Sequence, residues 1–336
     1  MTPDSSRHRS DAEKGIETLV CRCAGLKAAQ RVCVIYESAT RELAERIHQR
    51  CLSLGAESIL AETPPLLHHG VEPPEDVRRN MEQADVVFGL SIMSLAHSRA
   101  VRELIGRNGS YLSLPQYDWN VLSRPAMRTD FQSLIAPSQA LAETLSRGTD
   151  LEIRTPAGTQ LRCRIEGRCA TPAPGCCYKG GMIASPPDAE TNIPPREEFS
   201  EGVIVVDGSI PHPRLGVLDS PITLHVRGGL VKRMEGKQAR VLEEIFAGTD
   251  SPLAYTIAEI GIGLNPNARL CGNMLEDEGV AGTVHIGIGA NAALGGAIVV
   301  PFHLDHVLLR PTVRVDGREI ICQGRFDSQT RPGKES

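Results

Sequence analysis

Strands and helices alternate along the first half of the chain, and this order constrains the fold more than any other sequence feature. The β-branched run RVCVIY at Arg31–Tyr36 predicts a buried strand, and the amphipathic stretch Arg41–Leu54 predicts a helix after it. The same order continues with strands at Ser58–Leu60 and Asp85–Ile92 and a helix at Ser98–Ile105. Strands that are joined through helices lie parallel, so we expect a parallel sheet covered by helices.

The pattern changes near Gly148, where alternation of apolar and polar residues replaces the helical period. The segment LEIRTPAGTQLRCRIEG, which starts at Leu151, predicts two short strands around a Pro-Ala-Gly turn, and Gly202–Val206 predicts another strand. We therefore expect an N-terminal parallel-sheet α/β domain over residues 1–147 and a β-rich C-terminal domain over residues 148–336.

Three further segments complete the expected C-terminal domain. Thr171–Pro195 is rich in Pro and Gly and predicts a long surface loop. Val313–Cys322 predicts a strand, and Lys237–Phe246 predicts the main helix of this half.

Charge and hydropathy exclude several classes of protein. The net charge is −5, from 36 Lys and Arg against 41 Asp and Glu, which argues against binding through nucleic-acid phosphates. Apolar runs stay well below the roughly 20 residues of a membrane-spanning helix. The start of the chain, Met1–Lys14, is polar and unlike a secretory signal. We expect a cytoplasmic protein that binds neither nucleic acid nor a membrane.

The 10 cysteines include no CxxC pair, so neither a zinc ribbon nor a thioredoxin-type site is expected. Cys33 and Cys322 lie inside apolar stretches and are expected to be buried free thiols. The neighbouring pair Cys176 and Cys177 is interpreted as two incidental thiols in a loop rather than as a redox switch.

The glycine patterns of nucleotide sites are also missing. No GxGxxG follows the first strand, and no GxxxxGK[ST] occurs. The GxG pairs at Gly261 and Gly263 and at Gly287 and Gly289 lie in apolar segments, where such pairs are common. A dinucleotide site is therefore not expected.

Residue types that bind metal ions gather in three apolar segments of the second half. His303 and Asp305 form an HxD pair whose side chains would share one face of a strand. His285 lies in GTVHIGIG and Glu259 in YTIAEIGIG. Each residue alone is explained by hydrogen bonds in a core or at a strand end, but a buried carboxylate needs a partner or a cation. Together the segments favour a metal site.

A further carboxylate, Glu197 in NIPPREEF, is by itself typical of a solvated charge run. Carboxylates with imidazoles suit zinc, manganese, cobalt or iron(II). A set that included Glu197 could hold two ions about 3.5–4 Å apart, as two-metal hydrolases do.

Four segments resemble the metalloaminopeptidases of the aminopeptidase T (thermophilic leucyl aminopeptidase) family, in the same order and at similar spacing. They are NIPPREEF, AEIGIGLNP, GNMLEDEGVAGTVHIGIG and HLDHVLLRPTVRVDGREI. With a weaker match at LSRGTDLEIRTPAGTQLRCRIEGR they cover most of residues 145–322. The N-terminal half resembles the family only in its α/β layout.

The resemblance implies a set of metal ligands, namely Glu197, Glu259, His285, His303 and Asp305. It also places Glu278 at the family's Asp-Glu pair, where this residue is a candidate general base or a solvated loop carboxylate. The larger family members carry a Tyr seven residues after the first His, and Ala292 stands at that position here. One expected ligand or transition-state donor is therefore missing. The family's members dimerise, so the resemblance also implies a homodimer.

The iron-dependent 2,5-dihydroxypyridine 5,6-dioxygenases resemble the chain as well, in length and in the HLD and GLxP segments. They use one iron held by two His and one carboxylate. In those enzymes a His takes the position of Glu259, and the position of His285 is not a ligand. Here His285, His303 and one of Glu259 or Asp305 could supply such a triad.

These observations predict a metalloenzyme with one or two divalent ions, zinc, cobalt, manganese or iron(II). The main hypothesis is an aminopeptidase-like hydrolase that cleaves a small peptide or amide with a metal-activated water. The alternative is a mononuclear iron(II) dioxygenase that cleaves the ring of a hydroxylated pyridine or other aromatic. A metal-stabilised binding protein without catalysis is the third hypothesis.

Overall fold

The computed structural model describes residues 3–327, which form two compact units. The first unit reaches Gln132 and takes in Gly175–Pro187, and the second holds Ser133–Pro174 and the residues from Asp188 on. The fold class predicted from the sequence, a parallel α/β part followed by a β-rich part, is confirmed. The contacts divide the chain earlier than the expected boundary after residue 147, because helix α6 (Ile135–Arg147) packs against strands of the second unit.

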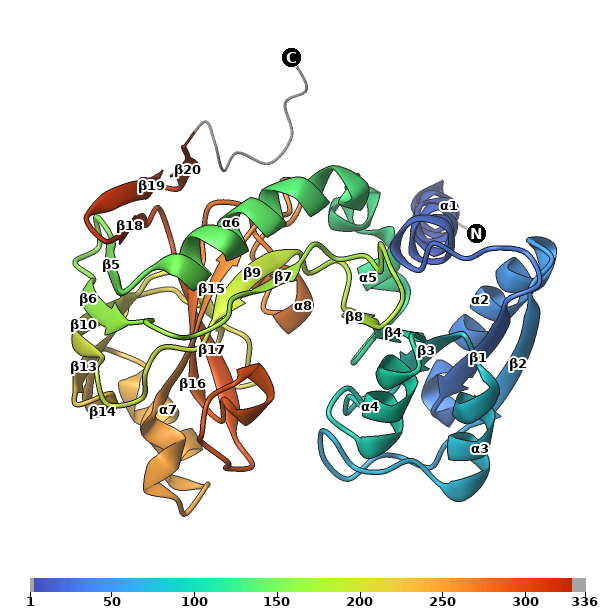
Figure 1. The fold of residues 1–336 in the computed structure, drawn as a ribbon, viewed down its shortest axis with the longest axis horizontal. Helices are drawn as coiled ribbons and strands as arrows, with labels where there is room; N and C mark the ends of the chain where they lie inside the picture. The colour runs from blue at the N-terminus through green and yellow to red at the C-terminus, as the bar shows by residue number, and fades with distance from the viewer. Residues whose placement is uncertain (1–2, 328–336) are drawn as a thin grey trace. The chain divides into compact units, whose positions relative to one another are not determined.

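The first unit is built on one parallel sheet with the strand order β2-β1-β3-β4-β8 (Figure 1). Its strands are β1 (Arg31–Tyr36), β2 (Glu57–Glu62), β3 (Val86–Leu90), β4 (Ser110–Ser113) and β8 (Met182–Ala184). Each neighbouring pair is parallel, as the alternation of strands and helices requires.

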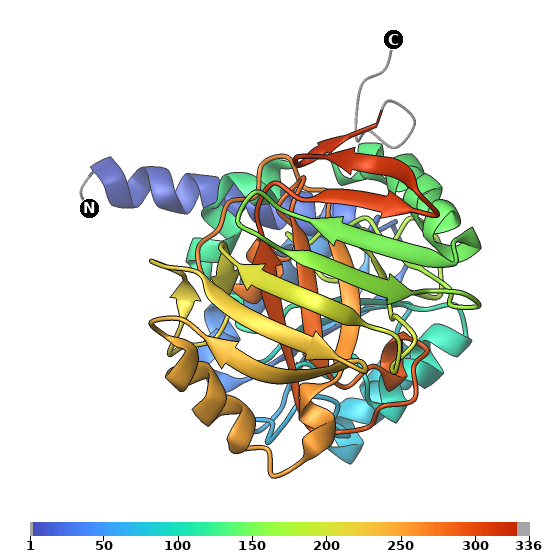
Figure 2. The same cartoon turned by 90° about the vertical axis from the view of Figure 1, so that its left-hand side faces the viewer.

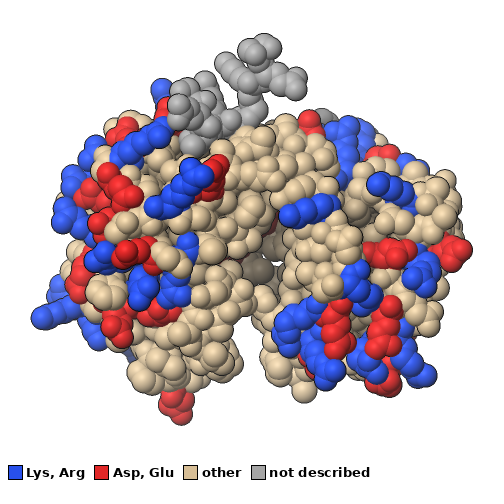
Figure 3. Space-filling model, viewed as in Figure 1, with Lys and Arg blue, Asp and Glu red and all other residues tan. Residues whose placement is uncertain are grey.

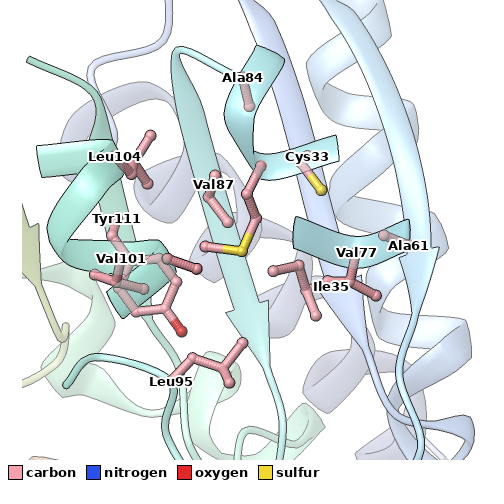
Figure 4. Packing of buried hydrophobic residues seen from close by; sticks show 12 residues of the cluster. Cys33, Ile35, Ala61, Val77, Ala84, Val87, Leu95, Val101, Leu104 and Tyr111 are labelled. Carbon is pink, nitrogen blue, oxygen red and sulfur yellow. The ribbon is translucent and has the colours of Figure 1, made fainter. Parts of the chain in front are cut away.

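Helices cover this sheet and bury an apolar core. Helices α2 (Arg41–Ser53), α3 (Glu75–Gln83) and α4 (Arg99–Gly106) pack on its strands, and α1 (Pro3–Glu17) packs against α2 and α5 (Trp119–Ser123). Figure 4 shows how Val77 of α3 and Val101 and Leu104 of α4 gather around Ile35 and Val87 of the sheet. Full burial of such a side chain contributes about 1.5–3 kcal/mol.

The second unit contains a larger antiparallel sheet with the order β14-β13-β10-β6-β5-β18-β19-β20. Its strands are β5 (Asp150–Arg154), β6 (Gln160–Arg164), β10 (Glu201–Val206), β13 (Ile222–Arg227), β14 (Leu230–Glu235), β18 (Thr312–Val315), β19 (Arg318–Cys322) and β20 (Arg325–Phe326). A small hairpin, β11 (Ser209–Ile210) with β12 (Gly216–Val217), follows β10 in the chain.

A second antiparallel sheet, here called the central sheet, has the order β17-β16-β15-β9-β7. Its strands are β7 (Thr171–Ala173), β9 (Glu190–Ile193), β15 (Ile257–Gly263), β16 (Val284–Gly289) and β17 (His303–Leu308). Figure 2 looks onto the larger sheet, behind which β15, β16 and β17 run.

Among the described residues, three α-helices belong to the second unit. Helix α6 packs against β7 and β9, and α7 (Ala239–Ala247) packs against β14. A short helix, α8 (Met274–Asp277), leads into the loop before β16. Helix α7 confirms the helix predicted from the sequence.

Two expectations about this unit are wrong. The stretch Thr171–Pro195 is not a long loop, because it supplies β7 and β9 to the central sheet and β8 to the first unit. The predicted strand Val313–Cys322 is a hairpin of β18 and β19, which turns at Asp316 and Gly317 with φ of 49° and 80°. Both errors come from pairings that the local sequence pattern does not encode.

The cysteines are free thiols, as expected. Cys33 is buried, but Cys322 is exposed at the end of β19, after the buried Ile320 and Ile321. Among residues 3–327, no helix combines the length and the apolar character that crossing a membrane requires.

Candidate metal centre

One face of the central sheet brings together Glu259, His303 and Asp305 from β15 and β17. Glu259 pairs with Gly287 of β16, and Gly287 pairs with Asp305, so the two carboxylates lie in one row across three strands. His303 Nε2 lies 3.2 Å from Glu259 Oε2 and 3.3 Å from Asp305 Oδ1. The three side chains each offer a donor atom within 4.8 Å of the others, which is the arrangement that a metal ion needs.

A second group of donors adjoins the first. Glu190, Glu259 and His285 also offer atoms within 4.8 Å of one another, and His285 Nε2 lies 2.9 Å from Glu190 Oε2. Glu259 belongs to both groups. The two groups are therefore neighbours that share one carboxylate.

Glycines make the space that the imidazole rings occupy. A Cβ atom at Gly261 would lie 1.9 Å from His285 Nε2, and one at Gly287 would lie 2.7 Å from the His303 ring. Because side chains alternate along a strand, both glycines point to the same face as the ligands. The first glycine of each GxG pair thus leaves room for an imidazole on this face of the sheet.

Two more carboxylates, Asp188 and Glu278, lie at the edge of the site. Glu278 follows α8, and its chain passes over Gly263, where a Cβ would lie 2.8 Å from the Glu278 carbonyl oxygen. Asp188 Oδ1 and Glu278 Oε1 are buried and have no hydrogen-bond partner among the described residues. Glu190 Oε2 and Asp305 Oδ1 are buried as well, and although each lies near an imidazole ring, neither accepts a well-aligned hydrogen bond from the described residues.

Burial and mutual repulsion shift the pKa values of these carboxyls. Burial, followed by the charges of Asp305 and Asp188, raises the pKa of Glu278 well above its ordinary value. Burial and the charge of Glu190 do the same for Asp188. The pKa of Glu259 is raised mainly by burial, which outweighs its hydrogen bond with His303. The raised pKa values show that burial and mutual repulsion make it costly for all of these carboxyls to be ionised at once.

The histidines respond in the opposite sense. Burial alone would lower the pKa of His285, but the negative charge of Glu190 beside it raises it to about 10. The pKa of His303 is raised because Asp305 and Glu259 outweigh its burial. Burial would raise the pKa of Asp305, but the charge of His303 lowers it overall.

This charge balance fits a divalent cation. Buried carboxylates outnumber the imidazoles beside them, and several of their oxygens lack partners among the described residues. A buried charge without a partner is costly, and a cation would satisfy these atoms together. Oxygen and imidazole donors suit iron, zinc, manganese and cobalt alike.

The donor group of Glu259, His303 and Asp305 is open to solvent on the side of His303. Its side chain is 31% exposed, whereas those of Glu259 and Asp305 are 8% and 6% exposed. His303 Nδ1 lies 2.8 Å from the carbonyl oxygen of Ala290, which can only accept a hydrogen bond. This contact places the proton on Nδ1 and leaves Nε2 free to bind a metal ion.

Glu197 does not join either donor group among the described residues. Its carboxylate accepts hydrogen bonds from the Asn291 side chain and the Ala297 backbone, and it pairs with Arg168. The structure therefore gathers Glu259, His285, His303 and Asp305 of the predicted set and places Glu197 in a separate network.

Sequence reasoning missed Glu190 and Asp188, since both lie in the stretch predicted to be a loop. Glu190 and Asn192 lie two residues apart and share one face of β9, but Glu190, Thr191 and Asn192 are polar in a row and show no alternation that would predict a strand. No sequence pattern identifies Asp188 either.

Comparison with known proteins supports the alternative of the two enzyme hypotheses. The sequence profile of the 2,5-dihydroxypyridine 5,6-dioxygenase (NicX) family matches residues 17–328. A Pseudomonas putida KT2440 protein named 2,5-dihydroxypyridine 5,6-dioxygenase is 25% identical over 258 residues, which are 74% of this chain and 72% of that protein.

Solved structures share the fold. A 2,5-dihydroxypyridine dioxygenase from P. putida KT2440 superposes with a TM-score of 0.82 at 20% identity, over 96% of this chain and 99% of its own. AmpT from Thermus thermophilus superposes with a TM-score of 0.69 at 16% identity, over 94% and 99%. The profile match spans most of the chain and includes the candidate metal centre, so the protein belongs to the 2,5-dihydroxypyridine 5,6-dioxygenase family of enzymes.

Proposed function

We propose that the protein is a mononuclear iron(II)-dependent dioxygenase that cleaves the ring of a hydroxylated pyridine or a related hydroxylated aromatic. The observation that carries the proposal is the family match over residues 17–328, which includes all of Glu259, His303 and Asp305. The expected hydrolase lacks such support, because AmpT resembles the chain at the level of the fold.

In this proposal Glu259, His303 and Asp305 hold the metal ion, so that Glu259 stands in for the second histidine that the resemblance to the dioxygenases implies. When bound, iron(II) supplies the one-electron chemistry that reactions with oxygen need. The three donors come from two strands of one sheet, and the partly exposed ring of His303 marks the side from which a substrate arrives.

Glu278 serves as a proton store at the edge of the site. Its raised pKa favours the protonated form, in which the carboxyl can donate a hydrogen bond to Asp305 and fix that ligand. A general-base role, which the sequence suggested, would require the ionised form. In the protonated form, Glu278 has a proton to give to a substrate atom within reach.

A second candidate function is favoured by the shared carboxylate. With Glu259 in both donor groups, Glu190 and His285 could hold a second ion beside the first. Two adjacent ions would suit hydrolysis of an amide, with Glu259 between them.

Oxygen uptake tests the proposal. The protein is loaded with iron(II) without oxygen, given 2,5-dihydroxypyridine or other hydroxylated pyridines and catechols, and exposed to ¹⁸O₂. We expect oxygen consumption with loss of the ring absorbance and incorporation of both labelled atoms into one product. Asp305→Asn should abolish uptake, whereas Glu13→Gln, an exposed change on α1, should leave it intact.

Failure to consume oxygen with any of these compounds would reject the proposal. Hydrolysis of amides by protein that holds two ions, lost in Glu190→Ala, would support the hydrolase instead.

A further inference from the structure

The loop over residues 290–302, here called the ligand loop, joins the two strands β16 and β17 that carry His285 and His303. The loop is closed by its own hydrogen bonds. Ala290 donates its backbone N–H to the Phe302 carbonyl at 2.8 Å, and the buried Asn291 side chain accepts from the Ile298 backbone at 2.8 Å. The loop therefore has a defined conformation, although several of its side chains are exposed.

Glu197, which is not part of the ligand loop, binds it through hydrogen bonds. One oxygen of its carboxylate accepts from the Ala297 N–H at 2.9 Å and from the Asn291 side chain at 3.1 Å. Burial would raise the pKa of Glu197, but these bonds and the charge of Arg168 lower it overall. The carboxylate is thus ionised and engaged near neutral pH.

Arg168 completes the attachment. Its guanidinium donates to the Gly295 carbonyl at 2.7 Å and pairs with the second oxygen of Glu197. The side chains of Arg168 and Glu197 are only 16% and 19% exposed, so this is a largely buried pair. Breaking such a pair leaves an unpaired charge, which costs more than losing a surface ion pair.

The ligand loop in turn orients a metal ligand. The Ala290 carbonyl, which precedes Asn291, accepts the hydrogen bond from His303 Nδ1. Partners of this kind fix the ring of a metal-binding histidine, and their loss typically weakens metal affinity about 10- to 100-fold.

We propose that Glu197 and Arg168 are positioning residues, which hold the ligand loop so that His303 Nε2 faces Glu259 and Asp305. The inference rests on the metal centre of the proposed function. It assigns Glu197 a role different from the ligand role implied by the aminopeptidase resemblance, and it gives Arg168 a role that no sequence motif indicated.

The test combines cobalt(II) affinity with hydrogen exchange of the ligand loop. Cobalt(II) is titrated without oxygen into the full chain and its Arg168→Ala, Glu197→Ala and Glu197→Gln variants. We expect about 10- to 100-fold weaker affinity for each alanine variant and faster exchange confined to residues 290–302. The double alanine variant should be no weaker than the single variants, because both changes release the same loop.

The Glu197→Gln variant separates positioning from direct ligation. The amide oxygen of its new side chain would still accept from Ala297 and Asn291, so this variant should recover most of the affinity and keep the cobalt(II) absorption spectrum of the wild type. The matched control is Arg214→Ala, which breaks the exposed pair with Glu244 of α7 and should change neither readout.

Two results would overturn the inference. Loss of cobalt(II) binding in Glu197→Gln as complete as in His303→Ala, with normal binding in Arg168→Ala, would make Glu197 a ligand. If hydrogen exchange of the ligand loop and cobalt(II) affinity were unchanged in both alanine variants, Arg168 and Glu197 would form a local ion pair without a positioning role. Neither readout uses a substrate, so the expected cobalt(II) results with no oxygen uptake would reject the proposed function and leave the positioning role standing.

Discussion

The two units of the chain differ in where their charged side chains lie. The core cluster of the first unit is apolar, and apart from the buried Glu37 most of its acidic and basic side chains lie on the surface, where Figure 3 shows them intermixed. Helices α1 and α2 are joined by a ladder of such pairs at successive turns: Arg9–Glu42, Glu13–Arg46 and Glu17–Arg50. In the second unit, carboxylates and imidazoles are buried on one face of the central sheet.

The difference separates residues that stabilise from residues that bind. Exposed ion pairs contribute about 0–1 kcal/mol each, so the ladder adds little and can vary. A buried acidic excess costs stability unless a cation compensates it. Its presence on the central sheet is therefore the strongest physical argument for a metal centre.

The largest contrast is expected from removing one carboxylate in each unit. Glu259→Ala should weaken divalent-metal affinity by more than about 100-fold, because this side chain belongs to both donor groups. Glu13→Ala, which removes an exposed ladder partner, should leave the affinity unchanged. Calorimetric titration of both variants measures the contrast. Equal affinities would show that the buried carboxylate is structural.

The pH dependence of metal binding should also be steep. The raised pKa of His303 favours the protonated ring in the metal-free protein, and a metal ion must displace that proton. Affinity should therefore rise about tenfold per pH unit for each proton displaced, until the pH passes the pKa of this histidine. Titrations in buffers of different ionisation enthalpy count the protons. Flat affinity between about pH 6 and 8 would contradict this charge balance.

Two glycine substitutions, one in each unit, are expected to have effects of intermediate size. Gly287→Ala places a Cβ against the His303 ring and Glu259, so it should displace a ligand and weaken metal binding about tenfold or more. Gly106→Ala at the end of α4 meets nothing within 4 Å and should stabilise its helix by about 0.4–1 kcal/mol. Metal titration and thermal unfolding of each variant test the pair. Tight binding by Gly287→Ala would mean that the ring lies elsewhere.

The smallest effect is expected on the ladder. Glu13→Gln should lower the free energy of unfolding by at most about 1 kcal/mol, and added salt should shrink the difference. Urea unfolding of the variant at low and high salt measures it. A loss well above about 1 kcal/mol that salt does not change would mean that the ladder pairs behave as buried charges, like those of the second unit.

Much of the fold followed from local sequence patterns. The strand at Arg31–Tyr36 and the helix after it were predicted because their apolar residues recur with a clear period. The strands within Thr171–Pro195 were not, because they pair with β15 and β4, which lie far away along the chain. Strands as short as three or four residues carry almost no period of their own.

The candidate site was predicted in the same uneven way. His303 and Asp305 were found because two donors two residues apart share a strand face. Glu190 was missed since its strand was missed, and the use of Gly261 and Gly287 as space for the rings emerged only from the register of three strands. The network around Glu197 depends on a loop conformation that no motif encodes.

The central claim is that Glu259, His303 and Asp305 together hold one divalent ion. The most direct test is iron content per chain after equilibrium dialysis without oxygen, for the wild type and for His303→Ala and Glu190→Ala. The account predicts one iron per chain in the wild type, retention in Glu190→Ala and loss in His303→Ala. Two ions per chain with one lost in Glu190→Ala, or no iron in the wild type, would contradict it.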